Sequence, residues 1–268
     1  MTVVVSRRRP PSGGGQPWTF AQLTTSLWLN ARNANTLFDA VTGGNNVSSG
    51  NAPAAWADAK GNGIRATQSI PERRLIYNAT GFNGLGCVTA AGGQVMVLPT
   101  LPLLTDANAG VIIYTFSLNN DIGYGVVAND SGHWERFSDG NSYPMLLRTD
   151  RLEALPLSMP TNGQHILVYI ANPAVPEYII RRNGVPILTR STPFTFSNNI
   201  AGIGAGHNIA NAGSGGTALN GSIAEIAVLP GVVALADVLR IEGYATHAAL
   251  MSGVLPANHL YKTAAPTV

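Results

Sequence analysis

Short apolar runs separated by turn-forming residues recur along most of the chain, and this pattern constrains the fold more than any other feature. Residues 110–117, 123–128 and 164–171 are rich in β-branched and aromatic residues, which is typical of buried strands. The 30 glycines and 17 prolines supply the many turns that such a chain needs. Only residues 234–250 show a helical period. The sequence therefore predicts an all-β, antiparallel sandwich with one C-terminal helix, at about residues 232–251.

The Asn183-Gly184 pair gives the clearest local signal. It lies between the apolar runs 178–182 and 185–188, and both of its residues tolerate the positive φ angles of a type I′ turn. We therefore predict a β-hairpin here. Pro186 is expected at a sheet edge or a bulge, because proline has no N–H to donate to a β-ladder.

The first and last strands and two long loops can also be placed. Residues 26–29 are expected to form the first strand and residues 221–229 the last, which ends at Pro230. The stretch 42–53 is rich in glycine, asparagine and serine, so we predict that it is a surface loop. The glycine-rich stretch 202–220 is predicted to be a loop between strands.

The first 17 residues do not follow this pattern. Arg7, Arg8 and Arg9 are followed by prolines and glycines, so this stretch cannot build a core. We expect residues 1–17 to be a flexible arm and residues 18–268 to be the domain. Two roles stay open for the arm. It is either a disordered tail, or a segment that orders against a neighbouring subunit, where the arginines could pair with carboxylates or nucleic acid.

Composition argues against several classes of protein. Only 11% of the residues are charged, against roughly 25% in a typical soluble domain, so uncharged polar residues or other subunits must cover much of the surface. Cys87 is the only cysteine, which excludes an intrachain disulfide framework. No apolar stretch is long enough for a membrane-spanning helix, so we expect no membrane insertion. The N-terminal apolar residues precede the arginines, the reverse of a secretory signal, so no conventional export signal is expected.

Three stretches, taken in order, point to a known family. Residues 26–39 contain Ser-Leu-Trp-Leu-Asn-Ala, residues 56–68 contain Trp-Ala-Asp-Ala-Lys-Gly-Asn-Gly, and residues 220–262 contain Ile-Glu-Gly-Tyr-Ala and Leu-Pro-Ala-Asn-His-Leu-Tyr-Lys. Together they resemble the laminin-G-like, concanavalin-type jelly-roll domains of bacterial surface proteins and phage structural proteins. The resemblance covers about residues 18–265. It implies a jelly-roll β-sandwich used for binding or assembly.

Calcium is the one candidate cofactor that the resemblance suggests. Asp58 and Asn62 are candidate ligands for calcium or a sugar. The alternative, which the sequence favours, is a structural turn in which Asp58 accepts backbone N–H groups and Asn62 adopts left-handed geometry. Asn30 stands where family members usually carry an aspartate, which weakens the case for calcium.

A catalytic centre is not expected. A glycosidase on this fold needs two carboxylates about 5–10 Å apart, but no two of the 14 acidic residues lie one position apart in the sequence. The five histidines lack metal-ligand spacing. Glu225, inside the last predicted strand, is expected to hold a turn or an arginine. We therefore expect that the protein is not an enzyme.

One group of aromatic and polar residues is the candidate sugar-binding site. Sugar sites combine an aromatic platform with amides and carboxylates, and one stretch of the chain brings these types together. The alternative is that the aromatic residues belong to the core. The candidate residues are Trp134, Tyr143, Tyr124, Asp139 and Asn141.

These observations predict a non-enzymatic structural protein of a phage virion: a decoration, fibre or tail-associated protein on the particle surface. Its expected partners are other virion proteins, bound through the arm, and glycans of the host or the environment. We expect it to be oligomeric in the particle. The alternative is a bacterial lectin module or a glycoside hydrolase of the same fold, which would call for an export signal, an acidic pair or disulfides.

Overall fold

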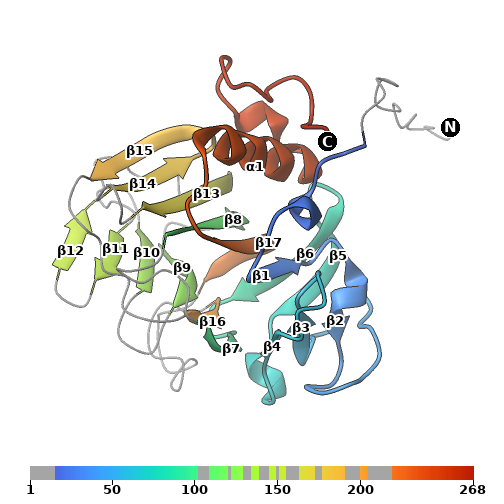
Figure 1. The fold of residues 1–268 in the computed structure, drawn as a ribbon. Helices are drawn as coiled ribbons and strands as arrows, with labels where there is room; N and C mark the ends of the chain where they lie inside the picture. The colour runs from blue at the N-terminus through green and yellow to red at the C-terminus, as the bar shows by residue number, and fades with distance from the viewer. Residues whose placement is uncertain are drawn as a thin grey trace, which may run out of the picture.

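The computed structural model describes most of the chain after the first 15 residues. The described residues are 16–101, 109–119, 122–128, 134–138, 145–148, 151–154, 163–172, 177–190, 200–204 and 219–268. Within them, two antiparallel sheets pack face to face, and one α-helix follows the last strand (Figure 1). The predicted all-β class with a single C-terminal helix is confirmed.

The first sheet has eight strands in the order β15-β14-β13-β8-β17-β6-β5, and β1 pairs with β17 off this path. β8 and β17 lie at its centre, and almost every side chain of both strands is buried. The strands are β1 (Leu27–Asn30), β5 (Ile76–Phe82), β6 (Leu85–Ala91), β8 (Gly110–Leu118), β13 (Gly163–Asn172), β14 (Glu177–Arg182), β15 (Val185–Arg190) and β17 (Asn220–Pro230).

The second sheet has nine strands in the order β12-β11-β10-β9-β16-β7-β4-β3-β2. These strands are β2 (Leu37–Phe38), β3 (Ala55–Ala57), β4 (Arg65–Thr67), β7 (Met96–Leu101), β9 (Ile122–Ala128), β10 (Trp134–Ser138), β11 (Met145–Arg148), β12 (Arg151–Ala154) and β16 (Ile200–Ile203). The last two residues of β16 fall in the predicted loop 202–220, which therefore starts too early. The sequence signal failed there because β16 is short and contains glycine.

Helical segments are few. The α-helix, α1, spans Leu235–Ala248 and is shorter than predicted, because Ala234 is still extended and Leu250 has a positive φ of 57°. Four 3₁₀-helices complete the described segments: η1 (Phe20–Gln22), η2 (Ala34–Thr36), η3 (Pro71–Arg73) and η5 (Ser252–Val254). Among the described residues, no helix is long and apolar enough to cross a membrane.

The predicted hairpin is confirmed as β14 and β15. Asn183 and Gly184 connect the two strands with φ angles of 50° and 82°, as a type I′ turn requires. Pro186 lies on the edge strand of the sheet, next to a register shift. This is the position expected for a residue that cannot donate to the ladder.

The molecule has two apolar cores. One fills the space between the sheets and includes Trp56, Tyr114 and Phe116. The other lies outside the eight-stranded sheet, where Ile113 and Val168 pack beneath α1 and the N-terminal segment (Figure 1). The central strands are therefore buried on both faces, which explains their continuous apolar runs.

The two ends of the described chain meet beside α1. Pro17 and Thr267 form an antiparallel bridge. Trp18 N–H donates to the Pro266 carbonyl at 3.1 Å, and Val268 N–H donates to the Gln16 carbonyl at 3.0 Å. Gln16, where the described chain begins, therefore lies on the side that carries α1 (Figure 1).

Candidate functional site

The outer face of the nine-stranded sheet is built by strand alternation. Trp56 and Met96 point into the core between the sheets, so their neighbours along each strand lie on the opposite face. Residues that pair across neighbouring strands form a row on this outer face. The row crosses four strands and consists of Phe38, Ala55, Thr67 and Val97. Val97, at its end, is 38% exposed.

A cation–π pair lies on this face. The Cζ atom of Arg65 lies 4.6 Å from the centroid of the Phe38 ring, and Nη1 donates to the Gly43 carbonyl at 3.4 Å. β3 lies between these two residues and presents only Ala55 and Ala57 on this face, and these small side chains leave room for the arginine to reach the ring. The result is a half-buried platform in which the Arg65 guanidinium lies over the Phe38 ring.

Backbone pairing continues the same row to a predicted sugar-binding residue. Val97 pairs with Gly202, Gly202 with Ala128, and Ala128 with Trp134. Trp134 is therefore in the same register row as the exposed Val97.

The other predicted sugar-binding residues are placed less fully. Tyr124 is on the neighbouring strand β9, where it pairs with Arg136. Asp139, Asn141 and Tyr143 lie outside the described residues. The grouping of the five residues into one site stays a prediction.

Asp58 forms a structural turn. Its Oδ1 accepts from Trp28 N–H at 2.6 Å, and its Oδ2 accepts from the N–H groups of Lys60 and Asn62, both at 3.0 Å. Asn62 Nδ2 donates to the Thr25 carbonyl at 3.3 Å. Both carboxylate oxygens thus tie the loop after β3 to β1, which supports the turn-holding role of Asp58 that the sequence favours. The predicted left-handed geometry of Asn62 is wrong, because the positive φ angles of this turn belong to Gly61 (78°) and Gly63 (79°). The calcium role stays a prediction, and no group of three metal-ligating side chains occurs among the described residues.

Glu225 is brought to the outer face of the eight-stranded sheet by a β-bulge. The register of β17 shifts between Ile223 and Glu225, so that Ala224 and Glu225 both lie on the α1 side. The Glu225 side chain is 1% exposed, and its Oε1 accepts from Trp28 Nε1 at 2.7 Å and Tyr244 OH at 3.3 Å.

An ion pair with Arg32 Nη2 at 2.7 Å completes this cluster. Burial lowers the pKa of Arg32, but the Glu225 charge, the nearby Tyr244 and the hydrogen bond to Glu225 together outweigh burial, so the pKa is raised. The pKa of Tyr244 is raised by burial and by the same carboxylate. Glu225 therefore holds an arginine, as the sequence predicts. Sequence spacing does not reveal its partners, because Arg32 and Tyr244 come from distant segments.

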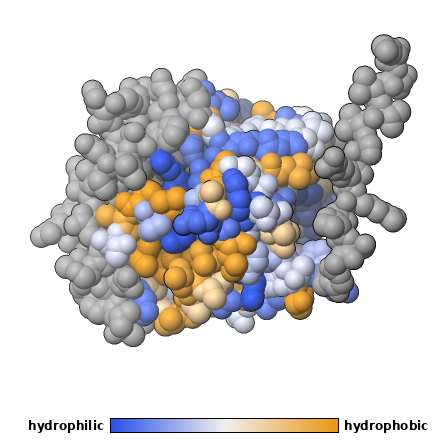
Figure 2. All heavy atoms as spheres, turned by 90° about the horizontal axis from the view of Figure 1, so that it is seen from above, coloured by the Kyte–Doolittle hydropathy of each residue, from blue (hydrophilic) through white to orange (hydrophobic). Residues whose placement is uncertain are grey.

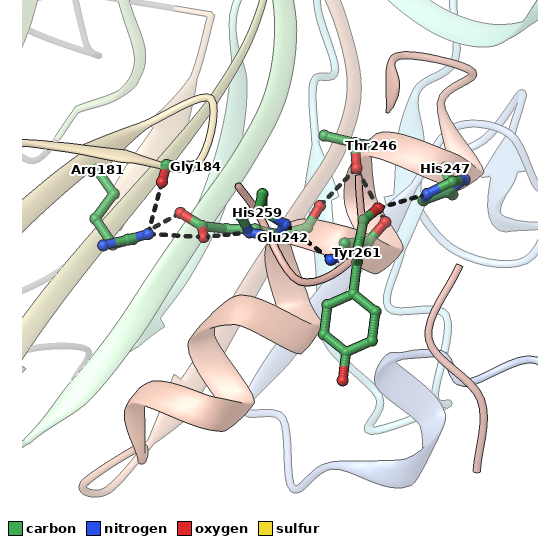
Figure 3. Close-up of polar contacts among 8 residues, drawn as sticks. Arg181, Gly184, Glu242, Thr246, His247, His259 and Tyr261 are labelled. Carbon is green, nitrogen blue, oxygen red and sulfur yellow. Dashed lines mark hydrogen bonds and ion pairs between the residues drawn. The ribbon is translucent and has the colours of Figure 1, made fainter. Parts of the chain in front are cut away.

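A second buried carboxylate, Glu242, lies in α1 (Figure 3). Its Oε1 accepts from Arg181 Nε at 2.8 Å, and its Oε2 accepts from Arg181 Nη2 at 3.1 Å. His259 Nε2 lies 3.2 Å from Oε2. Arg181 also donates to the Gly184 carbonyl at 2.7 Å. This network joins the β14–β15 hairpin, α1 and the C-terminal segment, and no sequence motif signalled it.

Comparison with known proteins identifies the fold. No family model matches the sequence, and no curated protein matches it. Domain 4 of AbnA, a GH43 extracellular arabinanase from Geobacillus stearothermophilus in complex with arabinotriose, is 14% identical, with a TM-score of 0.51 over 80% of this chain and 96% of that domain. A GH54 α-L-arabinofuranosidase is 13% identical, with a TM-score of 0.50 over 74% of this chain and 51% of that one.

The chain thus has a two-sheet β-sandwich fold similar to that of these two carbohydrate-active proteins. It spans about half the length of the arabinofuranosidase. At these identities the likeness establishes the fold alone.

Proposed function

We propose that the protein is a non-enzymatic module of a phage virion that binds glycans through the outer face of its nine-stranded sheet. The difference between the two outer faces carries this proposal. α1 and both chain ends cover the eight-stranded sheet. The other sheet presents the Phe38–Arg65 platform and the exposed Val97 in one register row with Trp134.

The chemistry of this platform suits a sugar. The apolar face of a sugar ring packs against an aromatic ring, while its hydroxyl groups need donors and acceptors at the edge. Phe38 on β2 and the Arg65 guanidinium that lies over its ring offer the packing surface, and Arg65 and Thr67 offer polar groups from β4, on the other side of β3. The solved complex of the similar arabinanase domain contains arabinotriose, which supports testing arabinose-containing oligosaccharides first.

The buried carboxylates support a binding role rather than hydrolysis. Retaining and inverting glycosidases need two carboxyl groups that face the substrate. Asp58 accepts three backbone N–H groups, and Glu225 and Glu242 are each paired with an arginine. None of these three carboxylates pairs with another carboxylate across a surface groove.

Two features of the α1 side support attachment to a particle. Arg7, Arg8 and Arg9 precede Gln16 in the sequence, and Gln16 lies on this side. Figure 2 looks onto this side and shows a broad apolar area, and Val232 and Leu235 at the start of α1 are 65% and 61% exposed. Exposed apolar patches mark surfaces that meet other proteins. Attachment on this side would direct the opposite, nine-stranded sheet away from the particle.

Binding to a panel of glycans tests the site. Trp134→Ala and Phe38→Ala should each weaken binding of the best glycan more than about fivefold, since truncating an aromatic anchor of a binding surface commonly costs more than about 1 kcal/mol. Val232→Ala on the α1 side is the matched control and should bind like the native protein. Native-like binding by both sheet variants, with their circular dichroism unchanged, would remove this face as the site.

Sedimentation with particles tests the virion assignment separately. The full chain should co-sediment with phage particles, and a chain that lacks residues 1–15 should stay folded but remain in the supernatant. A protein never found on particles would favour a free lectin module. Release of sugars from arabino-oligosaccharides would favour a hydrolase.

A further inference from the structure

The two oxygens of the buried Glu225 carboxylate are used unequally. Oε1 accepts from Trp28 Nε1 at 2.7 Å and from Tyr244 OH at 3.3 Å, and it forms the 2.7 Å ion pair with Arg32 Nη2. Oε2 is also buried, but it has no hydrogen-bond partner in the described part of the chain. Each oxygen of an ionised carboxylate can accept about two hydrogen bonds. Three donors therefore crowd one oxygen, while the other has none.

Arg32 shows the same asymmetry. Its Nε donates to Asn30 Oδ1 at 3.2 Å, and its Nη2 reaches both Glu225 Oε1 and Tyr244 OH. Nη1 is buried without a hydrogen-bond partner among the described residues. The ion pair is thus joined through a single oxygen, whereas a bidentate pair would satisfy both oxygens. Each of the two joined groups retains one buried polar atom, an acceptor on Glu225 and a donor on Arg32.

Thr115 brings a third buried polar atom to the same place. It pairs with Glu225 in the register of β8 and β17, and its Oγ1 likewise has no hydrogen-bond partner within the described ranges. Thr115 lies on the α1 side of β8, because it alternates with Ile113, which packs beneath α1. Glu225 lies on the same side. The extra residue of the bulge, Ala224, adds only a methyl group to this face, so it does not fill the space beside the carboxylate.

We propose that a buried water molecule binds in the β17 bulge, where it bridges Glu225 Oε2, Thr115 Oγ1 and Arg32 Nη1. Leaving a buried, charged oxygen without a partner is costly, and buried waters typically make about three hydrogen bonds to such groups. The site lies on the α1 side of the molecule and does not depend on glycan binding.

The chemistry of the three atoms selects the occupant. Glu225 and Arg32 already balance each other in charge, so a cation would face the guanidinium and an anion would face the carboxylate. The occupant must therefore be neutral, and it must donate to Oε2 and accept from Nη1–H. Water does both, and the Thr115 hydroxyl can complete its hydrogen bonds as either donor or acceptor.

A high-resolution crystal structure of the full chain tests the site directly. It should show a water about 2.5–3.2 Å from Glu225 Oε2 and at a similar distance from Thr115 Oγ1 and Arg32 Nη1. Two results would overturn the proposal: no water beside Oε2, or a Thr115 hydroxyl that donates directly to Oε2 in its place.

Magnetic relaxation dispersion of the water oxygen nuclei tests the site in solution, because its amplitude counts the buried waters that exchange slowly. Thr115→Val keeps the shape of the side chain but removes the hydroxyl, and it should lower the amplitude by the contribution of one water. Thr246→Val is the matched control. Thr246 is also buried, but its Oγ1 already lies 2.9 Å from the Glu242 carbonyl and 3.0 Å from the Gly243 carbonyl, so this variant should keep the native amplitude.

A native amplitude in Thr115→Val, or an equal fall in Thr246→Val, would refute the bridging site. If Thr115→Val does not fold, the crystal structure of the native protein decides alone.

Discussion

The two outer faces of the sandwich differ in what covers them. On the eight-stranded sheet, Val111 and Ile113 are fully buried under α1 and the N-terminal segment. On the nine-stranded sheet, Met96 and Leu98 are buried between the sheets, while Val97 between them is exposed. A continuous apolar run thus marks a strand with two covered faces, and alternation marks a strand with one open face. The proposed glycan site lies on the open face.

The largest expected effect comes from a matched pair of phenylalanines, one on each face. Phe20 is fully buried, and its ring centroid lies 4.8 Å from that of Tyr244, so Phe20→Ala should cost about 3–5 kcal/mol. Phe38 is partly exposed, and Phe38→Ala should cost less than about 1.5 kcal/mol, chiefly its contact with Arg65. Urea unfolding measures both. Equal losses would mean that the two faces are covered to the same degree.

A smaller effect is expected at Asp58, which ties the loop after β3 to β1. Asp58→Ala removes the acceptor of three backbone N–H groups and should lower the free energy of unfolding by about 1–3 kcal/mol. Asp58→Asn keeps one acceptor oxygen and should lose less. Adding calcium should leave the thermal midpoint of the native protein unchanged. A rise in the midpoint that Asp58→Ala abolishes would instead support the calcium site.

Alkaline pH should destabilise the covered face. Burial and the Glu225 charge raise the pKa of Tyr244, and burial raises the pKa of the Cys87 thiol. A folded pKa above the unfolded value means that stability is complete below the unfolded pKa and is lost as the pH rises. Unfolding measured above about pH 10 should show a loss of at most about 1.4 kcal/mol per pH unit for Tyr244. Tyr244→Phe should reduce this slope, and an unchanged slope would assign it to other groups.

The smallest effect is expected for a matched pair of valines. Val97→Ala on the open face should change stability by less than about 0.5 kcal/mol, whereas Val111→Ala on the covered face should cost clearly more, because it leaves a cavity. Thermal unfolding of the two variants compares them directly. If Val97 contributes to the glycan platform, Val97→Ala should also weaken glycan binding without loss of fold.

Local signals in the sequence were sufficient for much of the fold. The Asn183-Gly184 turn, the strand that became β8 and the helical period that became α1 each depend on residues within one short segment. Their geometry follows from backbone preference and from the spacing of apolar side chains. β16 escaped this reasoning because a short strand with glycine has neither signal.

The sites depend on contacts between distant segments. Glu225 meets Trp28 and Arg32 only because a bulge in β17 turns its side chain towards β1. Arg65 reaches Phe38 only because β3 places alanines between them.

The amino-acid sequence by itself determined that this chain alternates strands and turns, closes with one helix and has a hairpin at Asn183-Gly184. The tertiary structure decided which sheet α1 covers, which face stays open and where the two chain ends meet. The physical reason is that strand and turn preferences are properties of neighbouring residues. The covering of a face is a property of the whole packed chain, because it depends on where segments far apart in sequence bury their apolar sides.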